Sequence, residues 1–250
     1  MLTCFPVVNE ITLMYFLEAF LNLIYPPQCW LCHATLAERR QTLCVSCREK
    51  IRHNIPPFCA RCSRPLEKLS RSICHQCQKR LPDFDQSWAA TIYNDAMKEL
   101  LHQFKYKGKT GLRHFFADLL FVFIERYKVP VQQFDLLVPM PIHSAKYRER
   151  EFNQTVLLAE LLSKHFSLTC CDHNLARVAH GPAQALLSEK ERWTNVQGAF
   201  RIRQPQKIKN KSILIIDDLI TTGATASSAA ITCRKAGART VGILALSIGQ

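Results

Sequence analysis

Residues 213–225 contain the side chains of this chain that are best suited to binding a phosphorylated sugar. Four apolar residues with β propensity precede Asp217 and Asp218, and a Thr-Thr-Gly-Ala-Thr run then opens an Ala-rich segment. This order predicts a buried strand, a polar turn and the N-terminus of a helix. Backbone N–H groups at a helix N-terminus bind phosphate, and carboxylates accept hydrogen bonds from sugar hydroxyls. The predicted phosphate ligands are Thr221, Thr222, Gly223, Ala224 and Thr225.

A second polar segment, residues 139–154, follows another expected strand at 134–138. We expect it to be a loop that leads into a helix, and it carries the cations His143, Lys146, Arg148 and Arg150. Because the carboxyl ends of parallel strands meet at one edge of a sheet, this loop is expected to face the acidic pair. Its cations would then bind the pyrophosphate of a ligand held there. A solvated basic loop is the alternative.

A third polar set surrounds a Gly-Pro turn and precedes a strand-like stretch at 198–202. It consists of Arg177, Gln184, Arg192 and Asn195. Such residues carry little information by themselves, because exposed helix and loop positions account equally well for each of them.

Eight of the 12 cysteines form four Cys-x-x-Cys pairs, with eleven residues between the pairs in each half of a tandem repeat. Each pair places two thiolates on one tight turn, and two such turns form the tetrahedral sulfur cage that structural zinc prefers. Sequential pairing closes shorter loops than a crossed arrangement, so we favour it. The predicted sites are Cys29, Cys32, Cys44 and Cys47, then Cys59, Cys62, Cys74 and Cys77. A redox pair or an iron–sulfur cluster is the alternative.

Apolar periodicity predicts an α/β domain after the cysteine repeat. Strands alternate with helices, which indicates a mainly parallel sheet covered on both faces. The expected strands are 87–93, 134–138, 212–217 and 240–247, and the expected helices are 96–106, 112–127, 152–166 and 224–236.

The 250 residues are enough for one substantial domain and a small module. We expect an N-terminal apolar helix at 1–25, a double zinc ribbon at 26–80 and the α/β domain at 81–250. The net charge of +13 favours anionic partners such as nucleotides, pyrophosphate or nucleic acid. Paired cysteines without a clear secretory signal favour a reducing, cytoplasmic location. The apolar stretch 11–24 is too short and too polar for stable membrane insertion.

Residues 213–225 closely resemble the phosphoribosyl-pyrophosphate (PRPP) motif of type I phosphoribosyltransferases. Together with the cysteine repeat, the chain resembles the ComF/GntX family of competence proteins from about Phe20 onward. Further segments carrying the resemblance are Pro26 to Cys32, Phe104-Lys-Tyr-Lys-Gly108, Val138-Pro-Met-Pro141, Arg148-Glu-Arg-Glu-Phe-Asn-Gln154, Arg177 with Gln184, and Arg192 with Asn195 and Phe200.

This resemblance implies a type I phosphoribosyltransferase fold behind a double zinc ribbon. It implies that PRPP binds with Mg²⁺, that Asp217 and Asp218 hold the ribose, and that pyrophosphate is released. It also implies a cytoplasmic role in DNA uptake, natural transformation or the use of external DNA, with single-stranded DNA or DNA-processing proteins as partners. Candidate acceptor-side residues are Lys105, Tyr106, Arg177, Gln184, Arg192 and Asn195.

Three functions remain open at this point: a PRPP-dependent transferase with an unidentified acceptor, a non-catalytic PRPP or nucleotide sensor, and a zinc-ribbon adaptor for single-stranded DNA. One residue departs from the family pattern, since Glu151 stands where the family usually has glycine. A glutamate there adds negative charge and loses glycine's access to positive φ, unless Glu151 pairs with Arg148 or Arg150.

Overall fold

The computed structural model describes residues 25–39, 41–67, 72–178 and 198–249. The chain divides into two compact units, Met1–Lys50 and Ile51–Gln250. The first cysteine repeat lies in one unit, and the second repeat lies in the other together with the sheet. The apolar helix expected at 1–25 lies outside the described residues, apart from Tyr25 at its end.

The first ribbon, residues 29–47, is a tight hairpin followed by the short helix α2 (Val45–Arg48). The backbone N–H of Cys29 donates to the carbonyl of Ala34 at 2.8 Å, and that of His33 donates to the carbonyl of Cys29 at 2.9 Å. His33 has a φ of 61°, which lets the chain reverse directly after Cys32.

The second ribbon, residues 59–77, repeats this geometry thirty positions later and ends in α3 (His75–Lys79). Cys59 N–H donates to the carbonyl of Arg64 at 2.7 Å, and Ser63 N–H donates to that of Cys59 at 3.0 Å. Ser63 has a φ of 63°, matching its counterpart His33. The duplicated unit expected from the cysteine spacing is therefore confirmed in the backbone itself.

In the described residues, a five-stranded parallel sheet has the order β1-β7-β6-β2-β3. Residues 213–216 of β6 are fully buried, because helices cover both faces of the sheet. This confirms the mainly parallel α/β fold. The strands are β1 (Gln86–Ile92), β2 (Leu136–Pro139), β3 (Thr169–Cys170), β6 (Ser212–Ile220) and β7 (Thr240–Ile248).

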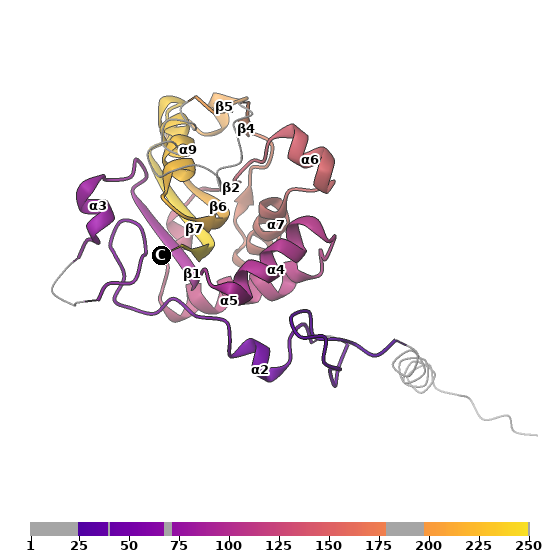
Figure 1. Cartoon of the computed structure of the whole chain (residues 1–250). Helices are drawn as coiled ribbons and strands as arrows, with labels where there is room; N and C mark the ends of the chain where they lie inside the picture. The colour runs from indigo at the N-terminus through magenta and orange to yellow at the C-terminus, as the bar shows by residue number, and fades with distance from the viewer. Residues whose placement is uncertain (1–24, 40, 68–71, 179–197, 250) are drawn as a thin grey trace, which may run out of the picture. The chain divides into compact units, whose positions relative to one another are not determined.

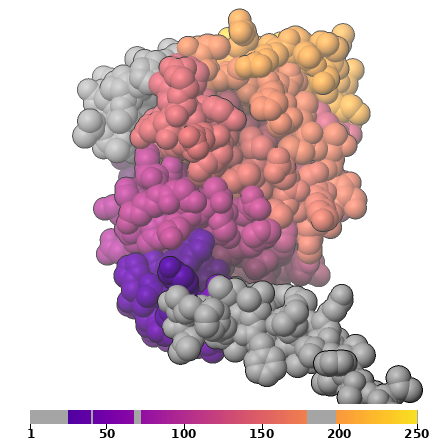
Figure 2. All heavy atoms as spheres, turned by 90° about the vertical axis from the view of Figure 1, so that its right-hand side faces the viewer, coloured from indigo at the N-terminus to yellow at the C-terminus, as the bar shows by residue number. Residues whose placement is uncertain are grey.

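Helices pack on the two faces of this sheet (Figure 1). On one face the small residues Ala226, Ala229 and Ala230 of α9 share a buried core cluster with Ile213 and Ile215 of β6. Figure 2 looks onto the side of the molecule where α4, α6 and α7 lie. The helices are α4 (Asp95–Tyr106), α5 (Leu112–Arg126), α6 (Ser144–Arg150), α7 (Gln154–Phe166) and α9 (Ala224–Lys235), with short 3₁₀ turns at Val131–Gln133 and Pro205–Lys207.

The structure corrects three expectations from the sequence. The basic segment is not a continuous loop, because Ser144–Arg150 forms α6. Strand β6 continues past the acidic pair to Ile220, and its pairing with β7 extends to Ile248. Two short strands, β4 (Leu175–Arg177) and β5 (Phe200–Ile202), form a separate antiparallel sheet, of which only the 198–202 part was expected.

Within the described ranges, every helix is too short or too polar to cross a membrane.

Candidate functional site

The two acidic residues of β6 lie buried at the carboxyl half of the sheet. Asp217 and Asp218 are 7% and 6% exposed. Lys105 Nζ of α4 lies 2.5 Å from Asp218 Oδ2, and the Gln154 side-chain amide donates to the same oxygen at 3.0 Å. Asp217 Oδ1 accepts from the backbone N–H of Asp218 at 2.9 Å. Helices α4 and α7 therefore converge on a carboxylate that follows them by many residues in the chain.

The two carboxyl groups differ in their acidity for physical reasons. Burial raises the pKa of Asp217, and the neighbouring charge of Asp218 raises it further. Burial also disfavours the ionised form of Asp218, but the Lys105 ammonium and the Gln154 amide outweigh that effect and hold its pKa below the usual value. Asp218 is thus the anionic member of the pair, and Asp217 is the member more readily protonated.

Arg150 belongs to the same network as the acidic pair. It is 8% exposed, and it donates to Tyr106 Oη at 2.7 Å and to Gln154 Oε1 at 3.2 Å. Its guanidinium carbon lies 4.5 Å from the centre of the Tyr106 ring, a cation–π distance. Arg150 therefore supports the site from inside, whereas Lys146 and Arg148 are exposed on α6.

Glu151 ends α6 in the left-handed conformation, with a φ of 65°. Its backbone N–H donates to the carbonyl of Tyr147 at 2.7 Å and closes the helix. Left-handed backbone is favourable for glycine and strained for glutamate. The position that departs from the family pattern is therefore one at which the backbone requires positive φ. No described ion pair joins Glu151 to Arg148 or Arg150 in the part of the chain that the structure covers.

The 221–225 segment connects β6 to α9 as the sequence predicts. Gly223 is the N-cap of α9 with a φ of 81°, and it offers no side-chain acceptor to the helix N-terminus. The backbone N–H of Ala224 reaches Thr222 Oγ1 at 3.4 Å, and the N–H of Ser227 donates to the Gly223 carbonyl at 2.8 Å. A positive-φ glycine before a helix is the geometry that admits an anion close to the backbone.

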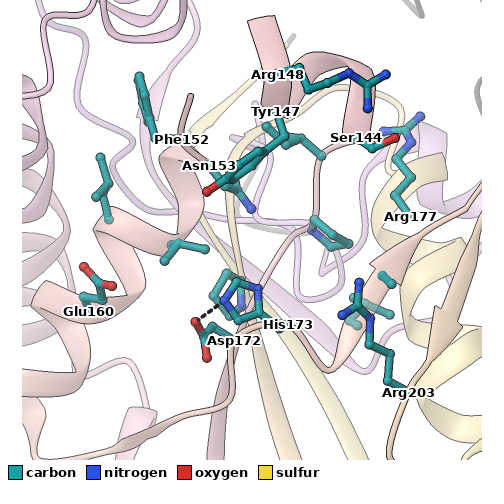
Figure 3. Close-up of a pocket in the computed structure, with 17 residues that line it drawn as sticks. Ser144, Tyr147, Arg148, Phe152, Asn153, Glu160, Asp172, His173, Arg177 and Arg203 are labelled. Carbon is teal, nitrogen blue, oxygen red and sulfur yellow. Dashed lines mark ion pairs between the residues drawn. The ribbon is translucent and has the colours of Figure 1, made fainter. Parts of the chain in front are cut away.

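A cavity of about 620 Å³ opens between α6, α7 and the β4–β5 sheet. Arg148, Arg177 and Arg203 approach it from three different elements, and Glu160 lies on the other side (Figure 3). At its floor, His173 Nε2 lies 2.9 Å from Asp172 Oδ2. Pro139, the last residue of β2, lines this cavity, whereas Asp217, Asp218 and residues 221–225 do not.

Two buried guanidinium atoms at this site have no hydrogen-bond partner among the described residues. They are Nε of Arg150 and Nε of Arg177. Burial lowers the pKa of Arg177, while the charge of Asp217 opposes that shift. A buried donor without a partner is costly, and of these two residues Arg177 lines the cavity.

The structure divides the predicted site residues between two places. Lys105 pairs with Asp218, and Arg150 joins Tyr106 to Gln154 in the same network. Arg148 and Arg177 line the cavity, while Lys146 is exposed. Gln184, Arg192 and Asn195 lie outside the described residues. Sequence reasoning gave no role to Gln154, Tyr147 or Arg203. Of these three, only Gln154 could have been singled out from the sequence, because it ends the Phe-Asn-Gln run that closes the 139–154 segment.

Both cysteine tetrads have the geometry of a zinc site. In each tetrad the four sulfur atoms lie within 4.8 Å of one another, and the grouping is the sequential one predicted from the sequence. Cys32 Sγ lies 3.6 Å from Cys44 Sγ, and Cys62 Sγ lies 3.5 Å from Cys74 Sγ. A tetrahedron with Zn–S bonds of about 2.3 Å places its sulfurs close to this distance apart. These tetrads support structural zinc.

Several known proteins are similar to this chain. Residues 20–78 match the model of the double zinc ribbon domain. The chain is 28% identical over 226 residues to the DNA utilization protein YhgH of Salmonella typhimurium, covering 90% of this chain and 98% of the relative. It is 25% identical to competence protein F of Haemophilus influenzae, covering 88% and 96%, and 35% identical to competence protein ComFC of Bacillus subtilis, covering 58% and 56%.

Solved structures also align with the sheet domain at low scores. A hypoxanthine phosphoribosyltransferase from Staphylococcus aureus aligns with a TM-score of 0.35 and 15% identity, covering 54% of this chain and 64% of that one. The UMP synthase of Leishmania donovani aligns with a TM-score of 0.34 and 16% identity, covering 61% and 24%.

The strand order and the cysteine tetrads define the class, a parallel-sheet α/β protein with an N-terminal double zinc ribbon. Relatives named for competence and for DNA utilization extend over nearly the whole chain. The chain is similar to proteins with these names over most of its length, which bears out the resemblance predicted from the sequence.

Proposed function

We propose that this protein binds PRPP with Mg²⁺ at the carboxyl edge of β6 and transfers the phosphoribosyl group to an acceptor, with release of pyrophosphate. The names of its relatives support a role in natural transformation or in the use of external DNA. Single-stranded DNA or DNA-processing proteins are the partners we expect.

One observation carries the proposal. The same strand–turn–helix unit presents two buried carboxylates and, directly after them, a glycine-capped helix N-terminus. The carboxylates suit the two ribose hydroxyls, and the 221–225 segment suits the 5′-phosphate. Arg148 and Arg177 line the cavity in which the pyrophosphate would lie.

The proposed reaction is a displacement at C1 of the ribose. The C1–O bond breaks and pyrophosphate leaves with the bonding electron pair. A lone pair on the acceptor nitrogen forms the new C1–N bond, and the N–H proton is lost to water. The protein's contribution is electrostatic: Asp218, whose pKa is lowered, stays ionised beside the electron-poor sugar, and Arg148 and Arg177 face the departing charge.

Mg²⁺ would be held chiefly by the pyrophosphate oxygens and would neutralise the charge of the leaving group. The hard oxygen donors of the acidic pair are compatible with it. Lys105 is already paired with Asp218, so its first role is to orient that carboxylate.

The decisive experiment is calorimetric titration of the zinc-loaded full chain with PRPP and Mg²⁺. We expect saturable binding that is lost in a D217N/D218N double variant and kept in a D118N control, in which an exposed carboxylate of α5 is changed. Zinc content should be equal in all three proteins. Unaltered PRPP affinity in the double variant would remove this site from the proposal.

A second measurement separates transfer from sensing. Pyrophosphate release is followed with nucleobases, nucleotides and single-stranded DNA as acceptors. Release that depends on one acceptor class supports the transferase. Binding without release across the panel indicates a PRPP sensor, and absence of PRPP binding together with salt-sensitive retention of single-stranded DNA indicates an adaptor.

A further inference from the structure

A single arginine of the second ribbon connects a zinc ligand to the candidate phosphate segment. The guanidinium of Arg64 donates to the backbone carbonyl of Thr221 through Nη2 and to that of Gly249 through Nε at 3.2 Å. Its third nitrogen, Nη1, lies 3.6 Å from Cys62 Sγ. Each nitrogen of this rigid guanidinium thus has a different acceptor. These acceptors are the zinc ligand Cys62, Thr221 of the 221–225 segment, and Gly249 just after the last strand.

These acceptors are linked to one another in the backbone. Gly249 N–H donates to the carbonyl of Ile220 at 2.8 Å, so the end of the last strand is already tied to the residue before Thr221. Arg64 closes the same junction from the ribbon side. The turn that leaves β6 is therefore fixed by β7 and by the second ribbon together.

The ribbon also supports the segment through a phenylalanine. Arg61 donates to the carbonyls of Pro82 at 3.2 Å and Phe84 at 2.6 Å, which holds the chain leaving the ribbon. Phe84 is fully buried, and its ring lies 3.8 Å from the position of a Cβ on Gly223. A small cleft remains between Cys62, Arg64, Thr222 and Gly223.

The first ribbon shows that a zinc ribbon as such does not require this arginine. The counterpart of Arg64 thirty positions earlier is Ala34, and that of Arg61 is Leu31. Both ribbons nevertheless form the same hairpin, because the N–H of Cys29 donates to the carbonyl of Ala34 and the N–H of Cys59 donates to the carbonyl of Arg64. The arginines are an addition to the second copy, and most of their hydrogen bonds go to backbone carbonyls outside the cage.

We propose that Arg64 is a positioning residue that makes the order of the 221–225 segment depend on zinc at the second site. Zinc fixes Cys62 and the hairpin that carries Arg64, and the guanidinium then fixes the carbonyls of Thr221 and Gly249. Loss of that zinc releases the anion-binding turn, while loss of the first zinc leaves it in place. This dependence on zinc exists in the protein without ligand, whether or not the 221–225 segment binds PRPP.

Amide hydrogen exchange of the full zinc-loaded chain, without ligand, tests this directly. The reporters are the N–H groups of Ser227 and Gly249, which bond to the carbonyls of Gly223 and Ile220. We expect R64A, which installs the residue of the first ribbon, to speed exchange at both about tenfold, because charge-assisted hydrogen bonds are lost. R64K should behave alike, since an ammonium cannot serve three divergent acceptors. R52A is the control, an exposed arginine of the same unit.

The zinc dependence is tested with matched cysteine variants. Cys74 and Cys44 occupy the same position in the two ribbons. The C74S and C44S variants should each lose one zinc ion. We expect faster exchange at Ser227 and Gly249 only in C74S. Unchanged exchange in R64A, or equal acceleration in C44S and C74S, would overturn the proposal. The R64A and R64K results decide the positioning role of Arg64 even if C74S unfolds, because these variants keep all eight zinc ligands.

Discussion

The two zinc ribbons have the same spacing and the same hairpin, yet only the second is built into the sheet unit. Cys62 is buried, whereas its counterpart Cys32 is exposed. The two ribbons differ in residues that are not zinc ligands. The second ribbon has Phe58, Arg61 and Arg64 at the positions where the first has Gln28, Leu31 and Ala34. Ligand spacing thus sets the metal cage, and the residues between the ligands decide what the cage supports.

Asn54, just before the second ribbon, shows how tightly that ribbon is attached. Its buried side-chain amide donates to the carbonyls of Ser63 at 2.8 Å and Ala89 at 3.0 Å. Ser63 in turn accepts from the N–H of Ala89 through its hydroxyl at 3.1 Å. Ribbon and β1 are therefore joined by polar bonds that are shielded from water, where each lost partner is costly.

Removing one zinc ligand from each ribbon in turn should show the largest difference between the two ribbons. We expect C77S to lower the melting temperature of the sheet unit by roughly 10 °C, because about 3 kcal/mol or more of zinc-linked stability is lost. C47S, at the same position of the first ribbon, should leave that transition in place. Differential scanning calorimetry with zinc analysis measures both, and equal shifts in the two variants would show that the ribbons are equivalent.

Asn54 gives the next largest effect. N54A should cost about 2 kcal/mol, because two buried carbonyls lose their donor. Urea unfolding of the zinc-loaded protein measures the loss, with H53A as the control at an exposed neighbour. A cost no greater than that of H53A would mean that the ribbon is held to β1 by other contacts.

Exchanging Phe58 and Gln28, which occupy the same position in the two ribbons, tests a further difference between the ribbons. The Phe58 ring lies 5.5 Å from the Tyr127 ring in an edge contact and 6.0 Å from the Phe123 ring. F58Q, which installs the residue of the first ribbon, should cost about 1 to 1.5 kcal/mol. The reciprocal Q28F should not stabilise the sheet unit. A stabilisation there by Q28F would contradict the division of roles between the ribbons.

The smallest expected effect is a stabilisation, and it comes from Glu151 at the end of α6. E151G should raise stability by about 1 kcal/mol, because glycine relieves the left-handed backbone at the end of α6. S167G is the matched control, since Ser167 ends α7 in the same conformation, with a φ of 55°. Both should melt higher, but only E151G should bind PRPP more tightly, since it also removes a negative charge. Equal PRPP affinities would assign Glu151 a backbone role alone.

The sequence predicted the regular elements well where a clear apolar pattern was present. The segment Ser144–Arg150 was missed as a helix because charged residues alternate through it and leave no apolar stripe. It is helical because His143 Nδ1 accepts the N–H of Ala145 at 3.2 Å and Glu151 closes the other end. Strand β3 is too short to show a pattern and is defined by its pairing with β2.

The candidate site was predictable as two segments but not as a network. Residues 213–225 were recognisable as a candidate site, because the two carboxylates and the Thr-Thr-Gly-Ala-Thr run are contiguous in the sequence. The pairing of Lys105 with Asp218, and the burial of Arg150 between Tyr106 and Gln154, join residues that are distant in the chain. Nothing local to those residues distinguishes a buried cation from an exposed one.

The sequence alone predicts the cysteine cages, the parallel sheet and the position of the 221–225 turn, because each follows from local spacing or from apolar periodicity. Only the tertiary structure decided which cations surround the acidic pair and which ribbon supports the turn. Arg64 meets Thr221 and Gly249 across the chain, and a contact of that kind depends on how the sheet brings its edges together rather than on any neighbouring residue.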